Sequence, residues 1–182
     1  MKMVIVKEVE RLLFRPNITT RAQYYCLCFL CEIVFTATLD QELANYLINI
    51  YFTIFNRYIK LGEVNNKTMS VLLTGVSRAF PYSKLETEFL EKYLDTFYRI
   101  LHYVNLNTGI QTLSLIFNLV NFNESGSLTD RFYSVLFRFI FNPQIDQCNE
   151  GNMLLNVIYR AIKRDPITKR IRAFVKQLFQ VI

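Results

Sequence analysis

Three of the four cysteines in the sequence stand close enough together to suggest a metal site. They form the motif C-x-C-x-x-C at Cys26, Cys28 and Cys31, and the fourth is Cys148. Thiolates bind zinc when they converge on one point. On a helix, Cys26 and Cys28 lie about 200° apart, so they face different sides. We therefore interpret the cysteines as small apolar side chains of a buried helix, and reduced thiols fit the cytosol or nucleus.

The residue types needed for catalysis are sparse. The single histidine, His102, would have to serve any Ser-His-Asp or Cys-His site, and it has no acidic partner nearby in the sequence. We interpret it as an ordinary, partly buried histidine. Neither of the glycine-rich phosphate motifs, GxxxxGK[ST] and GxGxxG, occurs, and the acidic residues are scattered. We expect a protein that is not an enzyme and that uses no metal and no cofactor.

Basic residues gather at the C-terminal end of the sequence. Residues 156–182 contain seven basic residues and one acid, Asp165, so their net charge of +6 equals that of the whole chain. A concentrated positive field attracts phosphate groups. The predicted contacts to a nucleic-acid phosphate backbone are Arg160, Lys163, Arg164, Lys169, Arg170, Arg172 and Lys176.

This basic cluster has two other interpretations. Cations in the last turn of a helix complement the helix dipole, which accounts for part of the cluster without any ligand. An acidic protein partner would also suit the charge. No base-reading motif accompanies the cluster, so contacts to a nucleic acid would position the chain rather than read a sequence.

The elements that position these residues are predicted to be helices. The 182 residues are 52% hydrophobic, with only five glycines and four prolines, and apolar positions recur every three or four residues. We expect an all-α chain of about nine helices, at residues 2–14, 20–38, 40–60, 67–80, 84–104, 108–122, 128–141, 152–164 and 166–181.

Capping signals support several of these boundaries. Capping boxes are predicted for Thr20 with Gln23, Ser83 with Glu86 and Thr108 with Gln111. Asp165 is predicted to cap the last helix, with Pro166 as its first residue. The apolar stripe of that helix is expected at Ile171, Phe174, Val175, Leu178 and Ile182.

The helices are expected to pair as antiparallel hairpins. Hairpins starting near residues 20, 67, 108 and 152 recur every ~40–47 residues, the period of HEAT and armadillo-like repeats. We predict a HEAT/armadillo-like α-solenoid in which residues 1–182 form a single helical-repeat domain, a segment of a longer array, with the first helix standing alone. A compact, irregular helical bundle is the alternative. The charged N-terminal segment does not resemble a signal peptide, and no stretch makes a convincing membrane span.

Five blocks of the sequence, taken in order, resemble one family. They are EVERLLFRPNITTRAQYYCLCFL (8–30), LLTGVSRAFPYSK (72–84), NTGIQTLSLIFNLV (107–120), LTDRFYSVLF (128–137) and YRAIKRDPITKRIRAFVKQLFQV (159–181). Together they resemble the CCAAT-binding-factor / nucleolar-complex family of large-subunit ribosome-assembly factors. The resemblance implies a non-catalytic helical-repeat scaffold in the nucleus and nucleolus. It would act in large (60S) subunit biogenesis and bind pre-ribosomal RNA and a second nucleolar-complex protein.

Two of the blocks supply further candidate contacts. In SRAFPYSK, Phe80 and Tyr82 are expected to wedge a hairpin corner, with Arg78 and Lys84 flanking it; in DRFY, Arg131 is expected at a repeat junction. All five residues are predicted to pack between repeats or to contact a partner, and Arg78 and Lys84 could also reach RNA.

Two other functions remain open from the sequence. One branch of the family is named for CCAAT-box transcription, so the first is a transcription cofactor. The second is a pure protein-interaction module whose basic end binds an acidic helix.

Overall fold

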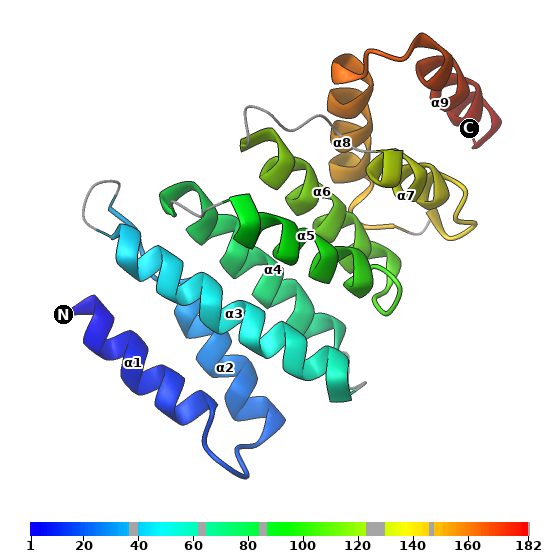
Figure 1. The fold of residues 1–182 in the computed structure, drawn as a ribbon. Coiled ribbons are helices and arrows are strands. Elements are labelled where there is room, and N and C mark those ends of the chain that lie inside the picture. Colours follow the sequence, from blue (N-terminus) through cyan, green and yellow to red (C-terminus); the bar gives the residue numbers. More distant parts are fainter. Residues whose placement is uncertain (37–39, 62–64, 84–86, 123–129, 146–147, 182) are drawn as a thin grey trace. The chain divides into compact units, whose positions relative to one another are not determined.

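The computed structural model describes residues 1–182 except 37–39, 62–64, 84–86, 123–129, 146–147 and 182 (Figure 1). In this described part there are nine α-helices, one short 3-10 helix and no strand. The elements are α1 (Lys2–Leu13), α2 (Thr20–Cys31), α3 (Gln41–Leu61), α4 (Asn66–Ala79), η1 (Phe80–Tyr82), α5 (Thr87–Ile100), α6 (Leu106–Phe122), α7 (Asp130–Ile140), α8 (Gly151–Arg164) and α9 (Thr168–Val181). The all-α prediction is confirmed.

The chain divides into two compact units. The first comprises Met1–Tyr103 and the second Val104–Ile182. The first unit contains α1 to α5 and the second contains α6 to α9. Each unit has its own apolar core. The assignment of residues 1–182 to one helical-repeat domain stays a prediction.

In the first unit, helices pack against the next helix but one. α1 contacts α3, α3 contacts α5, and α2 contacts α4, while α1 also packs on α2 and α3 on α4. Figure 1 shows α1, α3 and α5 as one row and α2 and α4 as another. The prediction that the first helix stands alone is wrong, because its Val6 and Leu13 are buried against these neighbours. The consecutive helices that pack together are α1 with α2 and α3 with α4. The prediction instead began the hairpins at residues 20 and 67, which pairs α2 with α3 and α4 with α5.

A glycine brings three helices of this unit close together. A Cβ atom on Gly75 of α4 would lie 2.6 Å from Cζ of Tyr51 in α3 and 2.9 Å from Sγ of Cys31 in α2. The Cys31 thiol is buried and donates a hydrogen bond to the carbonyl of Val71 at 3.2 Å. The cysteine interpretation is therefore right for Cys31, but Cys26 and Cys28 are partly exposed.

Two helix starts differ from the predicted capping boxes. Thr19, rather than Thr20, caps α2, since its hydroxyl accepts a hydrogen bond from the Ala22 amide at 3.2 Å. In α6 the side chain of Asn105 accepts from the Thr108 amide at 3.0 Å, so Thr108 lies inside the first turn. For the third box, the Ser83 hydroxyl donates to the Phe80 carbonyl, and Glu86 lies outside the described residues.

The helix predicted for residues 20–38 ends earlier, at Cys31. The next residues, Ile33 and Val34, are β-branched, which lowers helix propensity. The backbone here is held by other bonds. The Lys2 ammonium donates to the Val34 carbonyl at 2.9 Å, and the Thr36 amide donates to the Asp40 carboxylate at 2.8 Å.

In the second unit, α6 packs against α7 and α8, and α7 packs against α9. Ile110, Leu113 and Phe117 of α6 are buried, and its buried Thr112 hydroxyl donates to the Thr108 carbonyl. This helix thus forms the core on which the basic C-terminal helices are built. None of the described helices is long and apolar enough to cross a membrane.

Candidate functional site

The apolar side of α8 fixes which of its residues reach solvent. Leu154, Val157, Ile158 and Ala161 are buried, and they recur at helical spacing on the side that meets α6. The remaining side exposes the three predicted cations of this helix, Arg160, Lys163 and Arg164. They occupy its last two turns.

α9 presents a second group of cations. Lys169, Arg172 and Lys176 are exposed and, at spacings of three and four, lie on one side of the helix. Phe174 is buried on the side that meets α7. The predicted apolar stripe is only partly correct, since Val175 is 41% exposed.

The buried side of α9 also contains a residue that the stripe did not include. Gln177 is buried, three residues after Phe174, while Ile171 and Leu178 are partly exposed. The last predicted member of the stripe, Ile182, lies outside the described residues.

The turn between the two helices is formed by Asp165. Its carboxylate accepts a hydrogen bond from the Ile167 amide at 2.9 Å, the bond that the predicted cap would make to the second residue of a helix. The regular helix α9 nevertheless begins at Thr168, two residues later than the predicted start at Pro166.

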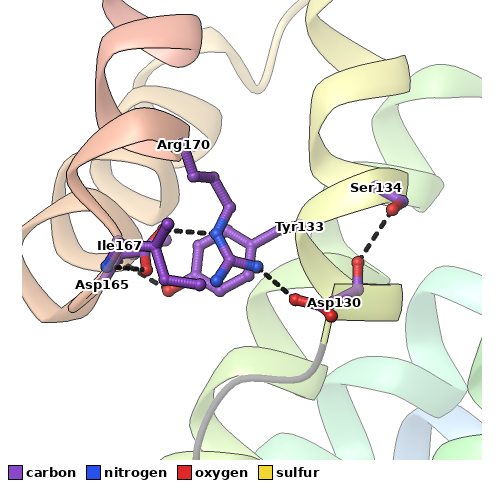
Figure 2. A network of polar contacts seen from close by, with 7 residues as sticks. Asp130, Tyr133, Ser134, Asp165, Ile167 and Arg170 are labelled. Carbon is purple, nitrogen blue, oxygen red and sulfur yellow. Dashed lines mark hydrogen bonds and ion pairs between the residues drawn. The ribbon is translucent and has the colours of Figure 1, made fainter.

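Arg170 differs from the other predicted cations because it is held inside the unit (Figure 2). Its Nε atom lies 2.7 Å from the Asp165 carboxylate, and its Nη1 atom donates to Asp130 at 2.6 Å. The guanidinium carbon also lies 4.0 Å from the ring centre of Tyr133, a cation–π contact. The side chain of Arg170 is 18% exposed and that of Asp165 is 1% exposed.

The electrostatics of this network favour the charged arginine. Burial acts to lower the pKa of Arg170, but the hydrogen bonds and negative charges of Asp130 and Asp165 outweigh burial and raise that pKa. Burial raises the pKa of Tyr133, whose hydroxyl donates to the Ala161 carbonyl of α8 at 3.2 Å. These contacts join α7 to α9 and to the end of α8.

With Asp165 buried, the exposed charges of residues 156–180 are all positive. They belong to six residues, which we call the basic surface: Arg160, Lys163, Arg164, Lys169, Arg172 and Lys176. A solvated helix face normally mixes both signs of charge, so two successive helices whose own exposed charges are all positive are a candidate site for an anionic ligand.

Aromatic rings accompany the cations on α8. The guanidinium of Arg160 lies 4.8 Å from the ring centre of Phe117 in α6. The ammonium of Lys163 lies 6.0 Å from the ring centre of Tyr159, which is 65% exposed. Sequence reasoning missed Tyr159 as a candidate, although its spacing of four residues from Lys163 predicts that the two side chains meet on a helix.

Comparison with known protein families identifies the second unit most clearly. Residues 109–182, which span most of that unit, match the model of the CBF/Mak21 family. The chain belongs to the CBF/Mak21 family. The family resemblance predicted from the sequence is therefore confirmed.

Several relatives match the chain from end to end. It is 42% identical over 181 residues to CCAAT/enhancer-binding protein zeta of Mus musculus, covering all of this chain and 17% of that protein. It is 31% identical over 217 residues to ribosome biogenesis protein NOC1 of Chaetomium thermophilum, covering all of this chain and 20% of that protein. Nucleolar complex protein 1 of Drosophila melanogaster is 37% identical over 187 residues, covering 98% of this chain and 15% of that protein. The chain thus spans a fifth or less of the length of these relatives.

The remaining predicted contacts of this CBF/Mak21 chain lie in separate places. Arg78 of α4 forms an ion pair with Glu32 at 3.4 Å, and Phe80 is buried. Tyr82 stacks on Phe35, with ring centres 5.2 Å apart. Arg131 is exposed in the first turn of α7, and Lys84 lies outside the described residues. The structure thus assigns packing to the two aromatic residues, and partner contacts at these positions stay predictions.

The single histidine and the possible metal ligands do not gather into a metal site in the described part of the chain. His102 is exposed in the turn after α5, so the prediction of a partly buried histidine is wrong. The reason is that α5 ends at Ile100, and His102 follows Leu101, the last buried residue before the turn. No cluster of three or more histidine, cysteine or acidic residues suited to a metal ion occurs among the described residues.

Proposed function

We propose that this CBF/Mak21 chain is a non-catalytic scaffold in the biogenesis of the large (60S) ribosomal subunit, and that its basic surface binds the phosphate backbone of precursor rRNA. The observation that carries the RNA part is the charge of that surface. All six of its cations are exposed, and residues 156–180 contain no exposed acidic residue. Phosphate contacts of this kind supply affinity without reading a base sequence.

The scaffold role is supported by the relatives and by the packing. Two of the relatives are named as a ribosome biogenesis protein and as a nucleolar complex protein, so we place this chain in the nucleolus with a second nucleolar-complex protein as its partner. Within each unit, helices contact the next helix but one, which is how helices stack in HEAT and armadillo-like solenoids. We propose that the two units form part of such an array.

Salt dependence of RNA binding tests the proposal. The probe is a fluorescein-labelled 20-nucleotide oligouridine, titrated with the full 182-residue chain at several salt concentrations. If five cations of the basic surface contact phosphates, log K should fall against log salt with a slope of about −3.5, at ~0.7 per contact on a single strand. The charge-reversed variant K169E/R172E/K176E should lose most of this binding.

The matched control reverses three exposed lysines of the first unit, K7E/K60E/K67E, and should keep the wild-type affinity apart from a small loss due to the changed net charge. A slope near zero for the wild type, or equal affinity of the wild type and K169E/R172E/K176E, would contradict RNA binding by the basic surface.

The printed name of the mouse relative raises a second candidate, a role at CCAAT promoters. That role requires binding that depends on DNA sequence, and backbone contacts from the basic surface do not provide it. Competition with unlabelled duplexes separates the two. We expect a CCAAT duplex and a scrambled duplex to displace the RNA equally well, and a preference for CCAAT of tenfold or more would favour the promoter role.

A further inference from the structure

α8 carries an exposed aromatic ring inside the basic surface. Tyr159 is 65% exposed, and Leu155, one turn earlier on the same side of the helix, is 58% exposed. The buried residues of α8, Leu154, Val157, Ile158 and Ala161, lie on a different side of the helix. An open aromatic ring of this size on a basic helix is a feature that phosphate binding alone does not explain.

One cation lies beside the Tyr159 ring, and a second occupies the next position along α8. Lys163 lies one turn further along α8, with its ammonium 6.0 Å from the ring centre. Arg160 is the adjacent residue and is held in place by its contact with Phe117, 4.8 Å from that ring centre. Phe117 is 2% exposed, so the position of Arg160 is anchored on the core of the second unit. A ring and two positioned cations therefore occupy about one turn of the helix.

We propose that Tyr159 stacks on an unpaired base of the RNA while Arg160 and Lys163 contact the phosphates beside that base. This inference rests on the proposed function and specifies its ligand as single-stranded RNA. Proteins that bind single strands combine a positive surface with aromatic side chains on which bases stack. A duplex keeps its bases stacked inside, so it satisfies the cations but not the ring. The charge around Tyr159 favours this ligand over an apolar segment of a protein.

The test compares Y159A with the wild type on two probes, a labelled 12-nucleotide oligoadenylate and a 12-base-pair RNA duplex. We expect Y159A to weaken single-strand binding by about 5- to 150-fold, the range found when one stacking residue is replaced by alanine. Duplex binding should change by less than about twofold, and the salt slope should be unchanged, because the substitution removes no charge. Y159F keeps the ring and should restore single-strand affinity.

Tyr25 provides the matched control. It is 56% exposed and has a cation on the same helix, with the Arg21 guanidinium 5.7 Å from its ring centre, but it lies in the first unit and outside the basic surface. Y25A should bind both probes as the wild type does. A 2-aminopurine base in the single strand reports stacking directly, since its fluorescence should fall on binding to the wild type and to Y25A but not on binding to Y159A.

The outcomes separate this inference from the function on which it rests. If Y159A binds the single strand as tightly as the wild type while K169E/R172E/K176E does not, the stacking role is wrong and backbone binding stands. Equal weakening on single strand and duplex would also overturn the stacking role, because it would show a general loss at the surface. If the wild type shows no salt-dependent RNA binding, both proposals fail together.

Discussion

Arg170 and Lys169 are adjacent in the sequence but lie in different environments. Lys169 is exposed on the basic surface, whereas Arg170 is 18% exposed and ion-paired with Asp130 and Asp165. Removing one partner of a buried ion pair is costly, because the other charge stays buried without compensation. Arg170 is thus mainly a stabilising residue, and we leave it out of the proposed RNA contacts.

The variant R170Q tests this assignment. It leaves the Asp165 carboxylate, 1% exposed, without its cation, and we expect the free energy of unfolding to fall by about 3 kcal/mol in urea denaturation. The control D130N alters the partner that is 92% exposed and should cost about 1 kcal/mol or less. Equal stability of R170Q and the wild type would show that the network contributes little.

The buried thiol of Cys31 gives a prediction about pH. Burial raises the pKa of Cys31 from 9.0 to about 11, so folding favours the neutral thiol. The stability from this group is present below about pH 9 and is lost as pH rises toward 11. Because the thiolate is the reactive form, iodoacetamide at pH 8 should modify Cys31 much more slowly than the partly exposed Cys26. Peptide mapping by mass spectrometry measures both rates, and similar rates would contradict the buried position of Cys31.

At the scale of elements, α9 is held to its unit by the packing of Phe174 as well as by the ion pairs of Arg170. Phe174 is 2% exposed and contacts the rings of Tyr133 and Phe137 in α7, with ring centres 6.1 and 5.3 Å away. The exposed side of the same helix carries Lys169, Arg172 and Lys176. Packing by Phe174 therefore determines whether those three cations are presented together.

F174A should detach or loosen α9. Removing a buried phenylalanine side chain costs about 3–5 kcal/mol, so we expect faster hydrogen exchange across residues 168–180 and weaker oligouridine binding. The neighbouring V175A, at a position 41% exposed, should change stability by less than about 1 kcal/mol and leave RNA affinity as it is. Wild-type exchange rates in F174A would mean that other contacts hold α9.

The sequence predicts the helices well and their partners less well. Helical periodicity and proline positions located all nine helices of the described part, because both signals are local. Two predicted caps were wrong because an earlier residue makes the capping hydrogen bond. Thr19 does so in place of Thr20, and Asn105 in place of Thr108. The pairing of α1 with α2, and the ion pairs of Arg170, depend on contacts between residues far apart in the sequence. No local pattern encodes those contacts.

The candidate site was also predicted only as far as local sequence signals allow. Charge counting located the cations of α8 and α9, and six of the seven are exposed. It could not distinguish Arg170, because the burial of Asp165 is a property of the folded unit. It also missed Tyr159, whose exposure depends on which side of α8 meets α6.

At the scale of the whole molecule, charge is strongly asymmetric. Residues 156–182 carry a net charge of +6, and the rest of the sequence contains basic and acidic residues in equal number. Such a distribution steers one end of the chain toward anionic ligands and leaves the remaining helices for contacts that do not depend on net charge. This suits a scaffold that binds RNA at one end and a partner protein elsewhere.

Crosslinking in cells tests this account most directly. The tagged chain is crosslinked to RNA by ultraviolet light, the bound RNA is sequenced, and the sedimentation of the protein is measured in parallel for the wild type and K169E/R172E/K176E. We predict reads concentrated on precursor rRNA of the large subunit, sedimentation of the wild type with precursor 60S particles, and loss of the reads in the variant. Crosslinks spread over unrelated RNAs, or a wild-type chain found only in light fractions, would contradict a scaffold that holds precursor rRNA.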